Sequence, residues 1–188
     1  MKKFILTLLS IFFAQVAGFS DELHFDNETY KLKFSALAAK TQGFGNEYFR
    51  NDESCSDWSK MIGIYDYPKE NNPIKYANEF NKIIEKTDNC VFLKLVENKD
   101  ANKAVLSFLT NGEQNSKKYF EYDVYKFEKL KKGGMLVIKY ASKYYFKDNK
   151  EIEKIAQKIK KDNDKYIGMM IVSGTPTIIE KDIPTTSN

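Results

Sequence analysis

The residues most suggestive of chemistry are two carboxylates, Glu121 and Asp123, flanked by Tyr119 and Tyr125. Residues two apart on a strand lie on the same face, with Cβ atoms about 7 Å apart. Such a pair could serve as acid and base in glycoside hydrolysis. The acidic-aromatic strip could equally bind a sugar or a basic partner. A third interpretation is a solvent-facing strand paired with lysines across the sheet, which depends on the strand register.

Nucleophilic catalysis is not favoured by the sequence. His24 is the only histidine and lies close to the expected start of the mature chain, so we interpret it as a surface residue. Neither G-x-S-x-G nor S-x-x-K occurs. Ser59-Lys60 and Ser142-Lys143 are adjacent pairs, and neighbours on a strand point to opposite faces. The sequence therefore predicts a protein without enzymatic activity.

The chain contains two cysteines, Cys55 and Cys90. An even count in an exported protein predicts one disulfide between them. A metal pair would need further ligands, and the sequence has neither a C-x-x-C spacing nor a second histidine. We therefore expect a disulfide, no metal site and no cofactor.

The first 20 residues have the layout of a secretory signal peptide. A basic start, Met1-Lys2-Lys3, precedes an apolar run at 4–13 and small residues at 14–18. The run is shorter than the roughly 20 residues of a membrane-spanning helix. We expect cleavage after Gly18 or Ser20, and a periplasmic or secreted product. Removing Lys2 and Lys3 changes the formal charge from +4 to +4 − 2 = +2.

The composition is that of one packed domain. Of 188 residues, 42% are hydrophobic and 14% aromatic, which a disordered chain would not carry. The mean hydropathy of −0.54 argues against a membrane bundle. A single Arg and the small mature charge argue against nucleic-acid binding, because phosphate recognition favours forked guanidinium groups.

Apolar periodicity predicts seven strands, two helices and an extended C-terminal segment. Asn72 and Pro73 are start signals for the first helix, which Thr87-Asp88-Asn89 would end. Asp148-Asn149 are start signals for the second, which Gly168 would end. We expect turns at 43–45 and 111–112. The domain is predicted to span 21–172, followed by a tail over 173–188. The predicted strands are 29–36, 46–49, 58–67, 90–96, 103–109, 119–130 and 135–146.

The strand predicted at 135–146 is apolar on both faces, so it should be central and covered on both sides. The chain therefore predicts an α+β fold: a mainly antiparallel sheet of about six to seven strands with two helices packed on it. In the order of its elements, the chain resembles the α/β sandwich of the PsbP-like family over residues 25–170. The resemblance implies a single domain of this layout and carries over no functional residue.

These observations favour a binding protein that acts by protein–protein contact outside the cytoplasm. A specific hypothesis is an immunity protein against an envelope-targeting toxin, and the partner would be that toxin or another envelope protein. The expected contact residues are Tyr119, Glu121, Asp123 and Tyr125. Alternatives are a small-ligand or lipid-binding protein with a pocket between sheet and helices, and a hydrolase using Glu121 and Asp123. No stable membrane insertion is expected after cleavage.

Overall fold

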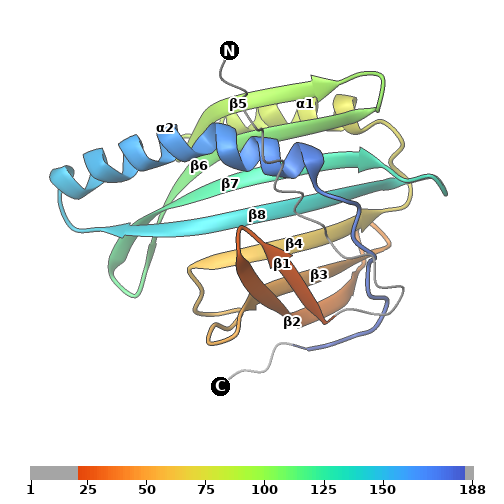
Figure 1. Cartoon of the computed structure of the whole chain (residues 1–188), viewed down its shortest axis with the longest axis horizontal. Coiled ribbons are helices and arrows are strands. Elements are labelled where there is room, and N and C mark those ends of the chain that lie inside the picture. The colour runs from red at the N-terminus through yellow and green to blue at the C-terminus, as the bar shows by residue number, and fades with distance from the viewer. Residues whose placement is uncertain (1–20, 185–188) are drawn as a thin grey trace, which may run out of the picture.

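A computed structural model describes residues 21–184 (Figure 1). The expected signal peptide, 1–20, and the last four residues lie outside this range. Eight antiparallel strands form one sheet in the order β1-β2-β3-β4-β8-β7-β6-β5, and two helices lie on its opposite faces (Figure 1). The strands are β1 (Glu22–Phe25), β2 (Glu28–Ala38), β3 (Gly43–Arg50), β4 (Lys60–Tyr67), β5 (Cys90–Asn98), β6 (Lys103–Gln114), β7 (Lys117–Lys129) and β8 (Met135–Phe146).

The predicted antiparallel sheet with two helices is confirmed, but the sheet has eight strands rather than six to seven. The missed strand is β1, whose four residues are too few for periodicity to stand out. Two predicted turns are wrong. Gly43 and Gly45 lie within β3, and β6 continues past Asn111 and Gly112 to a tight turn at 115–116.

Helix α1 (Pro73–Ile84) begins as predicted. Asn72 is the N-cap, and its side chain accepts a 3.0 Å hydrogen bond from the Lys75 backbone N–H. Pro73 occupies the first turn, where no intrahelical donor is needed. The helix packs on β5, β6 and β7, with Ile83 left exposed.

Helix α2 (Asn149–Val172) also begins as predicted, with Asp148 accepting a 2.9 Å hydrogen bond from the Glu151 backbone N–H. It does not end at Gly168, because the apolar stripe continues and packs on β6, β7 and β8. Within residues 21–184, neither helix combines the length and the apolar character needed to cross a bilayer.

Strand β8 is central, as predicted, between β4 and β7. Its even-numbered residues face α2 and its odd-numbered residues face the side of α1. The α2-side core includes Ile64, Tyr122, Val124, Ile138 and Tyr140. The α1-side core includes Leu106, Phe108, Phe127, Met135 and Val137. Burial on both faces explains the nearly continuous apolar sequence of β8.

Residues 173–184, predicted as a mostly extended tail, are extended but packed against the sheet. Ile179 is buried, and its backbone is held twice by the buried side chain of Asn46. Its N–H donates to Asn46 Oδ1 at 2.6 Å, and its carbonyl accepts from Asn46 Nδ2 at 2.9 Å. Ile183 forms an antiparallel bridge with Ser35, beyond the end of the β1–β2 pairing.

The predicted disulfide is not formed: Cys55 and Cys90 are free thiols. Cys55 lies in the β3–β4 loop and packs beside Trp58. Cys90 begins the edge strand β5 and packs in the α1-side core, with its Sγ 3.6 Å from Thr110 Oγ1. The two thiols thus belong to separate clusters, because strand pairing carries Cys90 to the far edge of the sheet.

Candidate functional site

The four residues predicted to form a contact strip lie together on the α1 side of β7, as their spacing required. Glu121 is opposite Lys143 of β8, and Asp123 is opposite Ala141. The neighbouring residue on that face of β8 is Lys139, opposite Tyr125. These registers bring one ammonium group beside two carboxylates.

Lys139 binds both carboxylates at once. Its Nζ lies 2.9 Å from Glu121 Oε1 and 3.0 Å from Asp123 Oδ1. The exposed fractions of the three side chains are 15% for Lys139, 17% for Glu121 and 4% for Asp123. The small side chain of Ala141, opposite Asp123, leaves room for the ammonium group. We name Lys139, Glu121 and Asp123 the buried ion triad.

Tyrosine rings enclose this triad. Lys139 lies opposite Gly63 on β4, and the Tyr65 ring folds back over that glycine. A Cβ at Gly63 would lie 2.6 Å from Tyr65 Cζ, so only glycine allows the ring to lie there. On the other side, the Tyr125 ring centroid is 5.7 Å from Lys139 Nζ. The triad is therefore buried by aromatic side chains rather than by a helix.

Asp123 and Glu121 share one buried ammonium, and the proton affinity of Asp123 is shifted in this place. Burial raises the pKa of Asp123 to about 7, against the opposing charge of Lys139. Burial also acts against the charge on Lys139, but Asp123, Tyr125 and Glu121 hold its pKa well above the usual value. Ionisation of all three groups would leave one uncompensated negative charge in a poorly solvated place.

This geometry corrects two interpretations of the strip. Asp123 is buried and does not face solvent, so it cannot contact a partner protein directly. Both carboxylates are bound to Lys139, and a water or sugar would have to displace that ion pair to reach them. The arrangement therefore gives little support to hydrolysis by Glu121 and Asp123.

A cavity of about 200 Å³ lies next to the triad, between α1 and the sheet. Its walls come from β4, α1, β7 and β8, and Tyr125 belongs both to the cavity and to the enclosure of Lys139. The lining side chains are four tyrosines, two phenylalanines and one valine: Tyr65, Tyr67, Tyr76, Phe80, Tyr125, Phe127 and Val137. A cavity of this size and lining suits a small ligand.

Ring contacts hold the cavity wall. Tyr76 lies 5.4 Å from Tyr67 and 5.9 Å from Phe127, measured between ring centroids. Phe80 meets Tyr125 edge-to-face at 5.4 Å. Such pairs add about 0.5–1.5 kcal/mol each beyond their area burial. The wall is therefore fixed by contacts between α1 and the sheet.

The sequence predicted Tyr125 as a site residue, but it did not predict the other residues that line the cavity. Tyr65 and Tyr67 alternate at the end of β4, and Tyr76 and Phe80 are four apart on α1, all ordinary core spacing. Lys139 carried a usable signal: a charged residue in the middle of an apolar central strand needs a buried partner.

A second aromatic group lies further along the same face. Lys143 Nζ is 3.9 Å from the Trp58 ring centroid and 5.1 Å from that of Tyr119. Tyr145, whose exposed fraction is 39%, packs on Tyr119 at 5.7 Å. Gln114 accepts hydrogen bonds from both Lys143 and Tyr145. We name Trp58, Lys143, Tyr119 and Tyr145 the aromatic platform.

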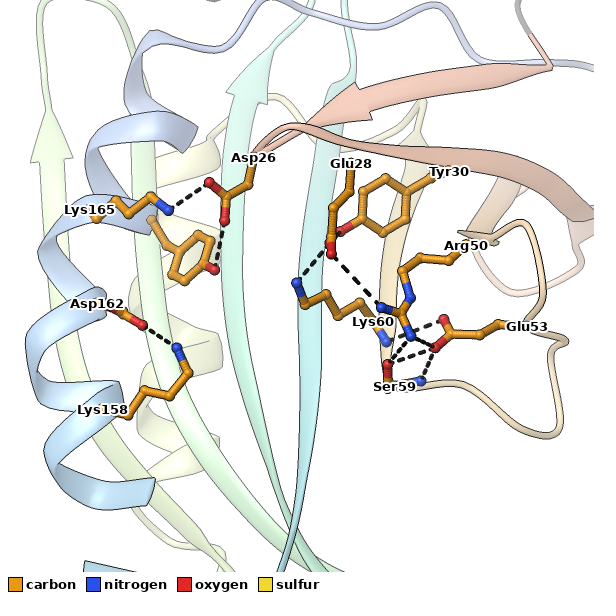
Figure 2. A network of polar contacts seen from close by, with 11 residues as sticks. Asp26, Glu28, Tyr30, Arg50, Glu53, Ser59, Lys60, Lys158, Asp162 and Lys165 are labelled. Carbon is orange, nitrogen blue, oxygen red and sulfur yellow. Dashed lines mark hydrogen bonds and ion pairs between the residues drawn. The ribbon is translucent and has the colours of Figure 1, made fainter. Parts of the chain in front are cut away.

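A polar network on the α2 side fixes the loop that carries Trp58 (Figure 2). Glu53 accepts hydrogen bonds from Arg50 at 2.6 Å and from the Ser59 hydroxyl at 2.6 Å. These bonds hold the pKa of Glu53 below its usual value although burial acts in the opposite direction. Glu28 extends the network by accepting from Lys60 at 2.7 Å. The network closes the β3–β4 loop and so positions the platform.

The histidine and the possible metal ligands considered from the sequence form no second site within residues 21–184. His24 is an exposed residue of β1, with Nδ1 3.0 Å from Thr29 Oγ1. Within residues 21–184, no group of three or more His, Cys, Asp and Glu side chains is arranged to hold a metal ion. The triad and the adjoining cavity are therefore the candidate site.

Comparison with known proteins gives one match, to a protein-family model. No curated protein and no solved structure matches the chain. A protein-family model matches residues 17–174, which is more than half of the chain. The chain belongs to this family. The family match contains all eight strands, both helices, the triad and the cavity, and it ends just after α2. Membership assigns no activity to them.

Asp123→Asn is expected to change how stability depends on pH. Because burial raises the Asp123 pKa from 3.8 to about 7, the folded state binds more protons than the unfolded state between those values. Asp123 therefore lowers stability as pH rises from 4 to 7. The stability of Asp123→Asn relative to wild type should rise over that interval, as measured by urea unfolding.

The matched control for this experiment is Asp100→Asn, in the exposed β5–β6 turn. Its stability relative to wild type should be independent of pH between 4 and 7. A constant difference for Asp123→Asn as well would show that the Asp123 carboxyl titrates normally in the folded protein.

Proposed function

We propose that this protein binds a small molecule in the cavity between α1 and the sheet. The single observation that carries the proposal is the 200 Å³ space bounded by seven mostly aromatic side chains from four elements. Ligand sites are typically concave, mainly apolar and supplied with a few polar groups that orient the ligand. Here the tyrosine hydroxyls would serve that purpose.

The cavity size limits the ligand. About 200 Å³ accommodates roughly eight non-hydrogen atoms, since a dry cavity of about 150 Å³ binds benzene, which has six. A lipid chain would extend beyond that volume. Planar rings or compact branched groups match the aromatic walls best. We further propose that the protein binds its ligand in the periplasm or after secretion, since residues 1–20 have the pattern of a signal peptide.

Titration with phenol, followed by the methyl NMR signals of Val137, tests the proposal. Saturable shifts are expected in wild type. Val137→Phe fills the cavity from β8 and should weaken binding at least about tenfold, because the added ring occupies the ligand's volume. Its titration is followed by the tyrosine ring signals.

Two further variants complete the test. Tyr76→Trp fills the cavity from the half-buried face of α1, where a larger ring is tolerated, and it should also weaken phenol binding. Tyr119→Phe, on the same sheet face but outside the cavity, should leave the affinity unchanged. Phenol binding that both cavity-filling variants retain would contradict the proposal.

Protein–protein contact is the second candidate function, and the aromatic platform supports it. Tryptophan and tyrosine are among the residues enriched in binding hot spots. The immunity hypothesis predicts that cells overproducing the wild-type protein survive a toxin encoded in the neighbouring gene. Cells overproducing Trp58→Ala should not survive, because that variant removes the ring stacked on Lys143. Equal survival with both proteins would contradict a role for the platform.

A further inference from the structure

The charges behind the cavity wall do not cancel. Behind Tyr125 lies the buried ion triad, with two carboxylates and one ammonium. Lys139 is already bound by both carboxylates, so its positive charge is neutralised locally. The triad therefore contributes either no net charge or one negative charge, according to whether Asp123 is protonated.

A third carboxylate lies behind the opposite wall. The Tyr65 hydroxyl donates a 3.1 Å hydrogen bond to Glu47 Oε1. Among the charged groups that interact electrostatically with the cavity-lining residues Tyr65 and Tyr125, three are acidic and one is basic: Glu47, Glu121 and Asp123 against Lys139. These four charges therefore sum to a negative value in both protonation states of the triad.

Tyr65 and Tyr125, which line the cavity, stay neutral. Burial raises the pKa of Tyr125 to about 12 and that of Tyr65 well above its usual value. Neutral phenol rings have a negative π face, which attracts cations within about 6 Å of the ring centre. Several such rings around one space form an aromatic cage, the arrangement by which proteins bind quaternary ammonium groups.

We propose that the cavity binds an organic cation, a small molecule that carries a quaternary or tertiary ammonium group. This inference rests on the proposed function and names the class of its ligand. The aromatic wall removes the cation from water and attracts it through the ring faces, while the carboxylates behind Tyr65 and Tyr125 supply the compensating charge.

Choline and its neutral carbon isostere, 3,3-dimethyl-1-butanol, test the inference by isothermal titration calorimetry. The two molecules have the same shape and differ in charge. Choline is expected to bind about thirtyfold more tightly, since a desolvated cation–π contact contributes about 2 kcal/mol. Glu47→Gln keeps a hydrogen-bond acceptor for Tyr65 and removes the charge, so it should reduce the preference for choline severalfold.

Glu79→Gln, on the exposed side of α1, removes the same charge away from the cavity and should leave the preference unchanged. Equal or tighter binding of the alcohol overturns the cation inference, while binding of the alcohol still supports a small-ligand cavity. Failure of both molecules to bind also overturns the inference, and the phenol titration then decides separately whether the cavity binds any ligand.

Discussion

Replacing Lys126 by methionine is expected to lower the free energy of unfolding by about 3 kcal/mol. Lys126 is on the α2 face of β7 with an exposed fraction of 1%. Its Nζ lies 2.8 Å from Glu128 Oε2 and donates to the Ser173 carbonyl at 2.7 Å. Methionine keeps the apolar stem but removes one of the two ammonium groups that bind the Glu128 carboxylate, and the cation at the end of α2.

The size of this effect follows from the surroundings of Glu128. Lys103 still binds it at 2.6 Å and Thr175 at 2.8 Å, so the carboxylate is not left entirely alone. The loss should therefore lie near the lower end of the roughly 3–5 kcal/mol seen when one partner of a buried ion pair is removed. Ser173 also caps α2, and a cation near a helix C-terminus is favourable.

Guanidinium unfolding of Lys126→Met measures the effect directly. The matched control is Lys129→Met, on the same strand but exposed, which should change stability by less than about 0.5 kcal/mol. Equal stabilities of the two variants would mean that the Lys126–Glu128 pair contributes no more than a surface ion pair.

Asn46→Ala is expected to lower stability by about 3 kcal/mol and to release the C-terminal segment. The variant removes the two hydrogen bonds to the Ile179 backbone and the 2.8 Å bond from Asn46 Nδ2 to Ser35 Oγ. The buried Ile179 N–H would then have no acceptor, and a buried unsatisfied donor costs about 1–3 kcal/mol.

Two measurements separate local release from general destabilisation. Urea unfolding gives the loss of stability, and trypsin cleavage after the exposed Lys181, followed by mass spectrometry under native conditions, reports release of the segment. Cleavage should be at least tenfold faster in Asn46→Ala than in Asn51→Ala, an exposed control in the β3–β4 loop. Identical cleavage rates would show that Asn46 does not hold the segment.

The pattern of seven of the eight strands was readable because side-chain alternation is local. Residues 135–146 are apolar on both faces, and this alone placed β8 in the centre of the sheet. The same alternation put Glu121 and Asp123 on one face. The caps Asn72 and Asp148 were predicted because a capping side chain bonds within three residues of itself.

Burial of the candidate site could not be predicted in this way. Asp123 is covered because Gly63, sixty residues earlier, lets the Tyr65 ring lie beside Lys139. The expected Cys55–Cys90 disulfide failed for the same reason, since strand pairing across the whole sheet separates the two thiols. Neither the register between strands nor the separation of the two thiols can be predicted from a short stretch of sequence.

The amino-acid sequence by itself determined the kind of elements, their order, the starts of both helices and the face on which Glu121 and Asp123 lie. These follow from periodicity and capping, which act over a few residues. Only the tertiary structure decided that these carboxylates share Lys139 and adjoin an aromatic cavity. That outcome depends on the packing of four elements that are distant in the chain. The register between paired strands determines which side chains lie together and exclude water.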